Sequence, residues 1–117
     1  MIIRISSSTY KQTIKNEREI TNSEFAPEAG KIVIVEFGAS WCGPCRASKQ
    51  VLEEFSKEHP DVDVCTVDVD ENEELVSEYQ IRSVPAIFFF NDCEKRATHV
   101  GGITKQTLEQ KYAETLK

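Results

Sequence analysis

The sequence has no apolar run long enough to cross a membrane and no excess of basic residues. Its 117 residues are 39% hydrophobic and 29% charged, which is a globular composition, whereas a membrane-spanning helix needs about 20 consecutive apolar residues. Fourteen Lys and Arg stand against 20 Asp and Glu, for a formal net charge of -6. That charge repels phosphate backbones and anionic head groups. We therefore expect a soluble monomer that binds neither nucleic acid nor membranes.

We also expect no targeting signal in this sequence, and it has few cysteines. Residues 1–8 contain neither the basic stretch nor the apolar core of a secretory signal, so we expect a cytoplasmic protein. The four cysteines are not expected to form a structural disulfide framework in a reducing compartment, and a domain of this length does not depend on one. We expect these cysteines to be reactive or to bind a metal ion instead.

Hydrophobic periodicity predicts a single α/β domain over residues 1–117. Short apolar or alternating runs predict five strands, at residues 2–5, 32–37, 62–69, 86–90 and 95–100. Helical spacing predicts helices near residues 10–14, over about three turns after the cysteine pair, at 75–79 and at 105–116. Thr104 is the expected N-cap of the last one. Alternating strands and helices favour a central mixed sheet of about five strands flanked by helices, the last two strands forming an antiparallel hairpin.

Two of the cysteines, Cys42 and Cys45, are spaced to form one reversible disulfide. In a helix that begins near Cys42 they share a face, with Cβ atoms roughly 5 to 6 Å apart. Cys42 then lies at the positive end of the helix dipole, which favours its thiolate and makes it the expected nucleophile. Cys45 lies one turn further in, shielded from large substrates, as the expected resolving thiol. Pro44 in the first turn stiffens the loop without losing a hydrogen bond.

The segment around this pair resembles the thioredoxin family. The matching residues are Trp41-Cys42-Gly43-Pro44-Cys45 after a buried strand, Ile81-Arg82-Ser83-Val84-Pro85 before another, and Val100-Gly101-Gly102 before the last helix. The resemblance implies the thioredoxin fold and an oxidoreductase that reduces protein disulfides through a redox-active Cys42–Cys45 disulfide, with no bound cofactor and no metal. It also implies thioredoxin reductase as electron donor and substrates such as peroxiredoxin or ribonucleotide reductase.

The same resemblance indicates where a substrate binds. Pro85 is expected to follow a cis peptide bond and to face the cysteine pair, leaving the Val84 backbone to hold an extended substrate segment; an ordinary trans proline is the alternative. Gly101 is expected to admit a substrate backbone, or to be a plain turn glycine. Trp41 either contacts substrates or packs in the core. The candidate substrate-binding residues are Trp41, Gly43, Pro44, Val84, Pro85 and Gly101.

A single acidic residue, Glu36, interrupts an otherwise apolar strand. Desolvation should raise its pKa and allow it to accept the proton of Cys45, which makes Glu36 the third candidate catalytic residue. The alternative is that its head group reaches solvent. Thioredoxins usually have Asp at this place, and protein disulfide isomerase domains resemble this chain in having Glu. Thr66 and Gly38 also depart from the family, which often has a buried lysine and an aromatic residue there, and both changes can shift the redox potential.

The remaining cysteines leave other functions open. Cys65 lies in an apolar strand and is expected to be a core residue. Cys93 lies in a polar turn, where exposure permits glutathionylation or bridging between molecules. A zinc site formed by all four cysteines is an alternative, although the spacing lacks the usual second close pair. An isomerase-like oxidoreductase is suggested by Glu36 and opposed by Gly43-Pro44, and a non-catalytic adaptor is a further alternative.

Overall fold

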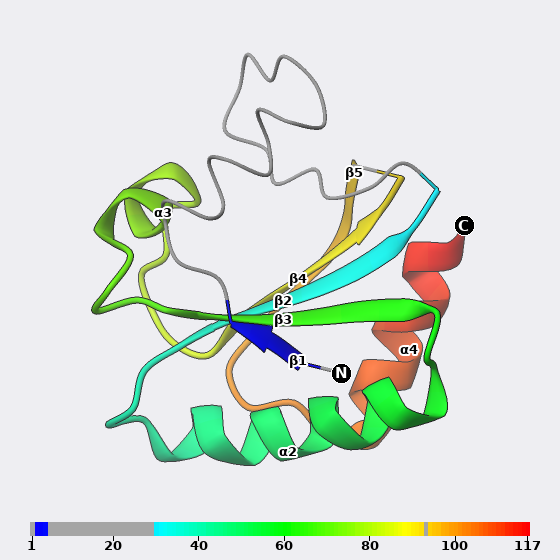
Figure 1. Ribbon diagram of the computed structural model, residues 1–117, viewed down its shortest axis with the longest axis horizontal. Coiled ribbons are helices and arrows are strands. Elements are labelled where there is room, and N and C mark those ends of the chain that lie inside the picture. Colours follow the sequence, from blue (N-terminus) through cyan, green and yellow to red (C-terminus); the bar gives the residue numbers. More distant parts are fainter. Residues whose placement is uncertain (1, 5–29, 93) are drawn as a thin grey trace.

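The computed structural model describes residues 2–4, 30–92 and 94–117, and it arranges them around one mixed sheet (Figure 1). The strands lie in the order β1-β3-β2-β4-β5. Their bounds are Ile2–Arg4 for β1, Ile32–Gly38 for β2, Val62–Asp68 for β3, Ala86–Asn91 for β4 and Glu94–Val100 for β5. β3 runs parallel to β1 and β2, whereas β4 is antiparallel to β2 and β5. The predicted mixed sheet with a terminal hairpin is confirmed.

Three helices lie within the described residues: α2 at Gly43–Glu58, α3 at Glu73–Glu78 and α4 at Lys105–Leu116. α2 has 16 residues and is longer than the three turns predicted. Thr104 caps α4 as expected, its hydroxyl accepting the Thr107 amide at 3.2 Å. No helix in the described ranges is both long and apolar enough for a membrane crossing. The helix predicted near 10–14, and Cys93, lie outside the described residues.

The two faces of the sheet build two separate cores. On the α3 face, side chains from three strands pack against Leu75, among them Val35, Phe37 and Phe88. On the face covered by α2 and α4, Ile34 packs with Leu52, and Figure 1 shows these two helices on the opposite side of the sheet from α3. Because side chains alternate along a strand, Glu36 shares the face of Ile34. The carboxyl group therefore lies beneath α2.

Helical spacing predicted buried positions for Ala47 on α2 and Leu116 on α4, and both predictions were wrong. Ala47 is exposed, and Ser48 takes the buried place on α2, where its Oγ accepts the Ile103 amide at 2.9 Å. Leu116 is 53% exposed, whereas Thr115 is buried and its Oγ1 donates to the Lys111 carbonyl at 2.7 Å. In both cases a small hydroxyl residue fills the tight position because its polar atom finds a backbone partner.

Candidate active site

The cysteine pair lies where β2 leads into α2. Cys42 is the N-cap of α2, with extended backbone angles (φ -98, ψ 110), and its Sγ accepts the Cys45 amide at 3.1 Å. Pro44 lies in the first turn, which contains no acidic side chain. The positive end of the helix dipole is therefore not offset by a local carboxylate, and an N–H group points at the sulfur. Both features favour negative charge on Cys42.

Cys42 and Cys45 form a disulfide, with their Cα atoms 5.3 Å apart. The two residues are almost equally buried, at 5% and 4% exposure, so overall exposure does not distinguish them in the oxidised form. The surroundings of the two cysteines do distinguish them. Cys42 follows the exposed Trp41 and precedes the exposed Gly43, whereas Cys45 lines a pocket between α2 and the sheet. Cys42 is therefore the cysteine that is flanked by exposed residues.

The loop before β4 faces the pair. The Val84–Pro85 peptide bond is cis, as the resemblance implied, and the trans alternative is wrong. The carbonyl oxygen of Val84 lies 3.9 Å from Sγ of Cys42. The Pro85 carbonyl accepts the Gly101 amide at 2.8 Å, and Gly101 has φ +99, a conformation that favours glycine. This geometry brings three separate chain segments to the disulfide.

Trp41 lies on the surface beside the disulfide. It is 67% exposed, so the core-packing alternative is wrong. Its indole Nε1 donates to Oδ2 of Asp70 at 2.9 Å, and Asp70 lies in the loop after β3, where its own amide donates to Oδ1 of Asp68 at 2.8 Å. Sequence reasoning missed Asp70. Its position just beyond β3 was the available signal, because β2 and β3 are parallel neighbours whose carboxyl ends share one edge of the sheet.

Glu36 is buried beneath the pair. It is 3% exposed, and its Oε2 has no hydrogen-bond partner among the described residues. The alternative in which its head group reaches solvent is therefore wrong. Burial raises the pKa of Glu36 to about 7, although the charge of Lys49 lowers it. A carboxyl group of this kind exchanges its proton close to neutral pH.

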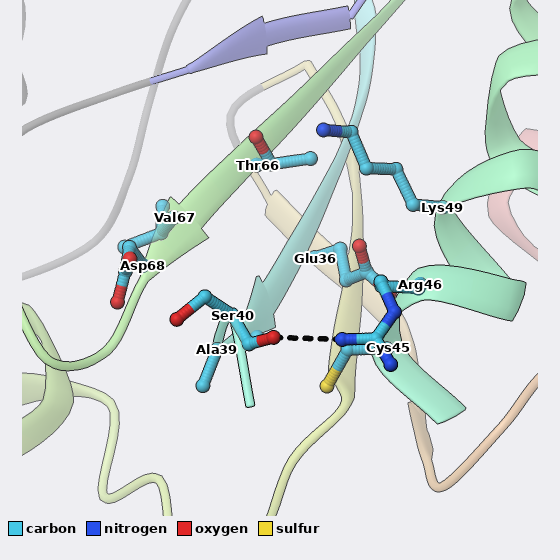
Figure 2. A pocket seen from close by; sticks show the side chains of 10 residues that line it. Glu36, Ala39, Ser40, Cys45, Arg46, Lys49, Thr66, Val67 and Asp68 are labelled. Atoms are coloured by element: carbon cyan, nitrogen blue, oxygen red, sulfur yellow. Dashed lines mark hydrogen bonds between the residues drawn. The ribbon is translucent and has the colours of Figure 1, made fainter. Parts of the chain in front are cut away.

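A cavity of about 280 Å³ connects these groups, and Figure 2 shows its lining. Glu36 comes from β2, Cys45 and Lys49 come from α2, and Thr66 comes from β3. The Arg46 guanidinium also lines it, and its Nη1 donates to the Ser40 carbonyl at 2.7 Å. Cys45 and the buried carboxyl group of Glu36 thus line one cavity.

Gly38 makes room for Cys45 at the end of β2. A Cβ atom at position 38 would lie 3.2 Å from Cβ and 3.3 Å from Sγ of Cys45. These distances are tighter than ordinary carbon–sulfur contact, so a side chain here requires Cys45 or the strand to move. The sequence marked Gly38 as a departure from the family, and in this structure a Cβ atom there would lie in tight contact with Cys45.

Cys65 is a buried free thiol, as predicted for a core residue. It packs among apolar side chains on the α3 face of the sheet, beside Val35 and Leu75. Burial, followed by the charge of Asp63, raises the pKa of Cys65 to about 12. A zinc site that includes both Cys65 and the disulfide pair does not fit this geometry, because the sheet separates Cys65 from the α2 face.

Comparison with known proteins agrees with this arrangement. A family model described as Thioredoxin matches residues 2–114. A thioredoxin of Alicyclobacillus acidocaldarius subsp. acidocaldarius is 39% identical over 97 residues, covering 82% of this chain and 92% of its own length. One of Mycoplasmoides gallisepticum is 40% identical over 80 residues, covering 68% of this chain and 80% of its own.

A solved structure of Fasciola hepatica thioredoxin superposes with a TM-score of 0.77 at 25% identity, covering 97% of this chain and 98% of that one. The predicted thioredoxin fold is thereby confirmed. A sheet in the order β1-β3-β2-β4-β5, a disulfide at the start of α2 and a cis proline facing it occur here together with a family match over nearly the whole chain. The chain therefore belongs to the thioredoxin family of thiol-disulfide oxidoreductases.

Proposed function

We propose that this protein is a protein-disulfide reductase in which Cys42 is the nucleophile, Cys45 the resolving thiol and Glu36 the proton acceptor. The observation that carries the proposal is the hydrogen bond from the Cys45 amide to Sγ of Cys42 at the first turn of α2. In the reduced protein the same amide and the helix dipole stabilise a Cys42 thiolate. The thiolate, not the thiol, is the attacking species in disulfide exchange.

The first step forms a mixed disulfide. The Cys42 thiolate attacks one sulfur of the substrate disulfide, a new S–S bond forms and the substrate S–S bond breaks. The second substrate sulfur leaves as a thiolate and takes a proton from solvent. Cys42 is the cysteine that attacks because it adjoins the exposed Trp41, whereas Cys45 faces the pocket.

The second step releases the substrate. Glu36 accepts the thiol proton of Cys45 through the cavity that both residues line, and the Cys45 thiolate then attacks Sγ of Cys42. The Cys42–Cys45 bond forms, the bond to the substrate breaks and the remaining substrate sulfur leaves as a thiolate. Two electrons have passed to the substrate, and the protein ends as the disulfide seen here.

The proposed substrate surface surrounds Cys42. It consists of Trp41, Gly43, Pro44, Val84, Pro85 and Gly101. Trp41 and Gly43 are exposed, and the Val84 carbonyl lies 3.9 Å from the Cys42 sulfur. An extended substrate segment that binds beside Val84 places its own disulfide near Cys42, and contacts through backbone atoms make few demands on substrate sequence.

We further propose that the chain acts as one monomeric domain over residues 1–117, with its own cysteine pair in place of a bound cofactor. Thioredoxin reductase is the proposed electron donor, and peroxiredoxin and ribonucleotide reductase are proposed substrates. A cytoplasmic location is proposed because the reduced pair has to be maintained in a reducing compartment. Fractionation of the source cells tests the location, since one relative is a chloroplastic M-type thioredoxin of Spinacia oleracea.

Insulin reduction with dithiothreitol as donor tests the proposal. The wild type should accelerate precipitation of the insulin B chain, Cys42→Ser should leave only the uncatalysed rate, and Cys65→Ala should match the wild type. Activity retained by Cys42→Ser would contradict the assigned nucleophile. A low reduction potential, close to that of a reductant and not of an isomerase, is expected for the Cys42–Cys45 couple.

A further inference from the structure

The pocket beside Cys45 holds a positively charged side chain that the mechanism above does not use. We propose that Lys49 is a positioning residue whose ammonium group is the counter-charge that keeps the Glu36 carboxyl group ionised and able to accept a proton. This inference rests on the proposed role of Glu36 as the proton acceptor of Cys45. If it is correct, a charged residue on α2 controls the protonation of Glu36 in the resolving step.

The helix brings Lys49 to the pocket. Lys49 follows Cys45 by four residues on α2, a spacing that puts the two side chains on one helix face. Lys49, Cys45 and Glu36 all line the same cavity. In Figure 2 the Lys49 side chain extends from α2 across the cavity toward β3, above Glu36. A lysine stem allows the ammonium group to remain hydrated while it approaches a buried carboxyl group.

Glu36 needs such a charge because it is buried and one of its carboxylate oxygens has no hydrogen-bond partner among the described residues. It is 3% exposed, and the oxygen in question is Oε2. Burial alone favours the protonated carboxyl, which cannot act as a base. A cation across the cavity offsets part of this desolvation, and the Lys49 charge does lower the pKa of Glu36.

The other groups around Glu36 do not supply this charge. Its neighbours in the sheet are Thr66 on β3 and Ile87 on β4, and neither is charged. Asp68, further along β3, also lines the pocket, and a carboxyl group cannot supply a positive charge. On α2, Arg46 also lines the pocket, with its Nη1 donating to the Ser40 carbonyl at 2.7 Å, but the charge that lowers the pKa of Glu36 is that of Lys49. Cys45 carries no charge either as a thiol or in the disulfide seen here. We therefore assign Lys49 as the cation that acts on Glu36.

Carbon-13 NMR of labelled glutamate side chains tests the assignment in the intact oxidised protein. Lys49→Met should move the titration midpoint of Glu36 upward by roughly half a pH unit or more, because an opposite charge has been removed. Lys49→Arg should restore most of the wild-type midpoint. Lys57→Met removes an exposed lysine further along the same helix and should leave the midpoint unchanged.

The results separate this inference from the proposed function. An unmoved midpoint in Lys49→Met, or an equal movement in Lys57→Met, overturns the role of Lys49, while Glu36→Gln still tests Glu36 as the base. The rate at which Cys45 resolves a mixed disulfide on Cys42 should follow the same midpoint as pH is varied. If the NMR midpoint moves and the kinetic profile does not, the base role of Glu36 fails and the catalytic part of this inference fails with it.

Discussion

Glu36 and Cys65 lie on neighbouring strands and are almost equally buried, at 3% and 4% exposure, yet their surroundings differ. Burial raises both pKa values, to about 7 for Glu36 and to about 12 for Cys65. Glu36 borders a cavity that also contains Cys45 and Lys49, whereas Cys65 packs into an apolar cluster on the other face. Burial alone therefore does not distinguish the two groups; the cavity and the nearby charge do, and they support the proposed role of Glu36.

The comparison extends to Cys45, the proposed resolving cysteine, which lines the same cavity as Glu36. Cys45→Ser should abolish turnover, because the mixed disulfide on Cys42 can no longer be displaced. Mass spectrometry should find the substrate covalently attached to the variant. Cys65→Ala is the matched control and should turn over normally without trapping substrate. Rapid release of substrate from Cys45→Ser would assign the resolving step to another group.

The two buried groups should affect stability in different pH ranges. The pKa of Glu36 rises from 4.5 to about 7 on folding, so the folded state holds this proton more tightly. Its contribution to stability is complete below pH 4.5 and is lost as pH rises through 7. The change corresponds to roughly 3 kcal/mol in the free energy of unfolding.

Urea unfolding of the oxidised wild type and Glu36→Gln at several pH values measures this contribution, since the variant cannot titrate at position 36. The difference between the two proteins should change by roughly 3 kcal/mol from pH 4 to pH 8. The free energy of unfolding of Cys65→Ala should have the same pH dependence as that of the wild type over this range, because the Cys65 pKa of about 12 lies far above it. A constant difference for Glu36→Gln would contradict the raised pKa.

Glu36→Gln should slow the resolving step by about 100-fold at neutral pH, the lower end of the usual contribution of a general base. Formation of the mixed disulfide on Cys42 should keep its rate. Stopped-flow measurement of both steps separates the two effects. A variant with the wild-type resolving rate and pH profile would show that the proton of Cys45 leaves by another path.

The smallest effect is expected from closing the space around Cys45. Gly38→Ala introduces a Cβ atom 3.2 Å from that of Cys45, and a shift of a few tenths of an ångström should slow the resolving step by about three- to tenfold. Gly102→Ala is a suitable control, because its Cβ atom meets nothing closer than 3.9 Å. Equal rates for Gly38→Ala and the wild type would show that Cys45 adjusts without cost.

Sequence reasoning succeeded where a local pattern decides the structure. Alternation and apolar runs predicted the strands, and the spacing of Cys42 and Cys45 predicted their disulfide. Sequence reasoning failed where the structure depends on contacts between segments that are far apart in the chain. The hydrogen bond from Trp41 to Asp70 joins residues 29 apart in the chain, and hydrophobic periodicity does not predict such a pair.

The cavity is also formed by segments that are far apart in the chain, so the sequence did not predict it. Lys49 carries one signal in the sequence, its place one helical turn after Cys45, but only the folded sheet puts Glu36 opposite it. The choice between Ala47 and Ser48 for the buried position likewise depends on the Ile103 amide, which comes from a loop far along the chain.

The central claim is that Cys42 is ionised near neutral pH while Cys45 is not. Alkylation of the reduced protein with iodoacetamide at a series of pH values, followed by peptide mapping, measures the two thiols separately. Cys42 should react far faster than Cys45, with a midpoint clearly below the value of about 8.5 for free cysteine. A Cys42 that reacts with the midpoint of free cysteine, or a Cys45 that reacts first, would contradict the account.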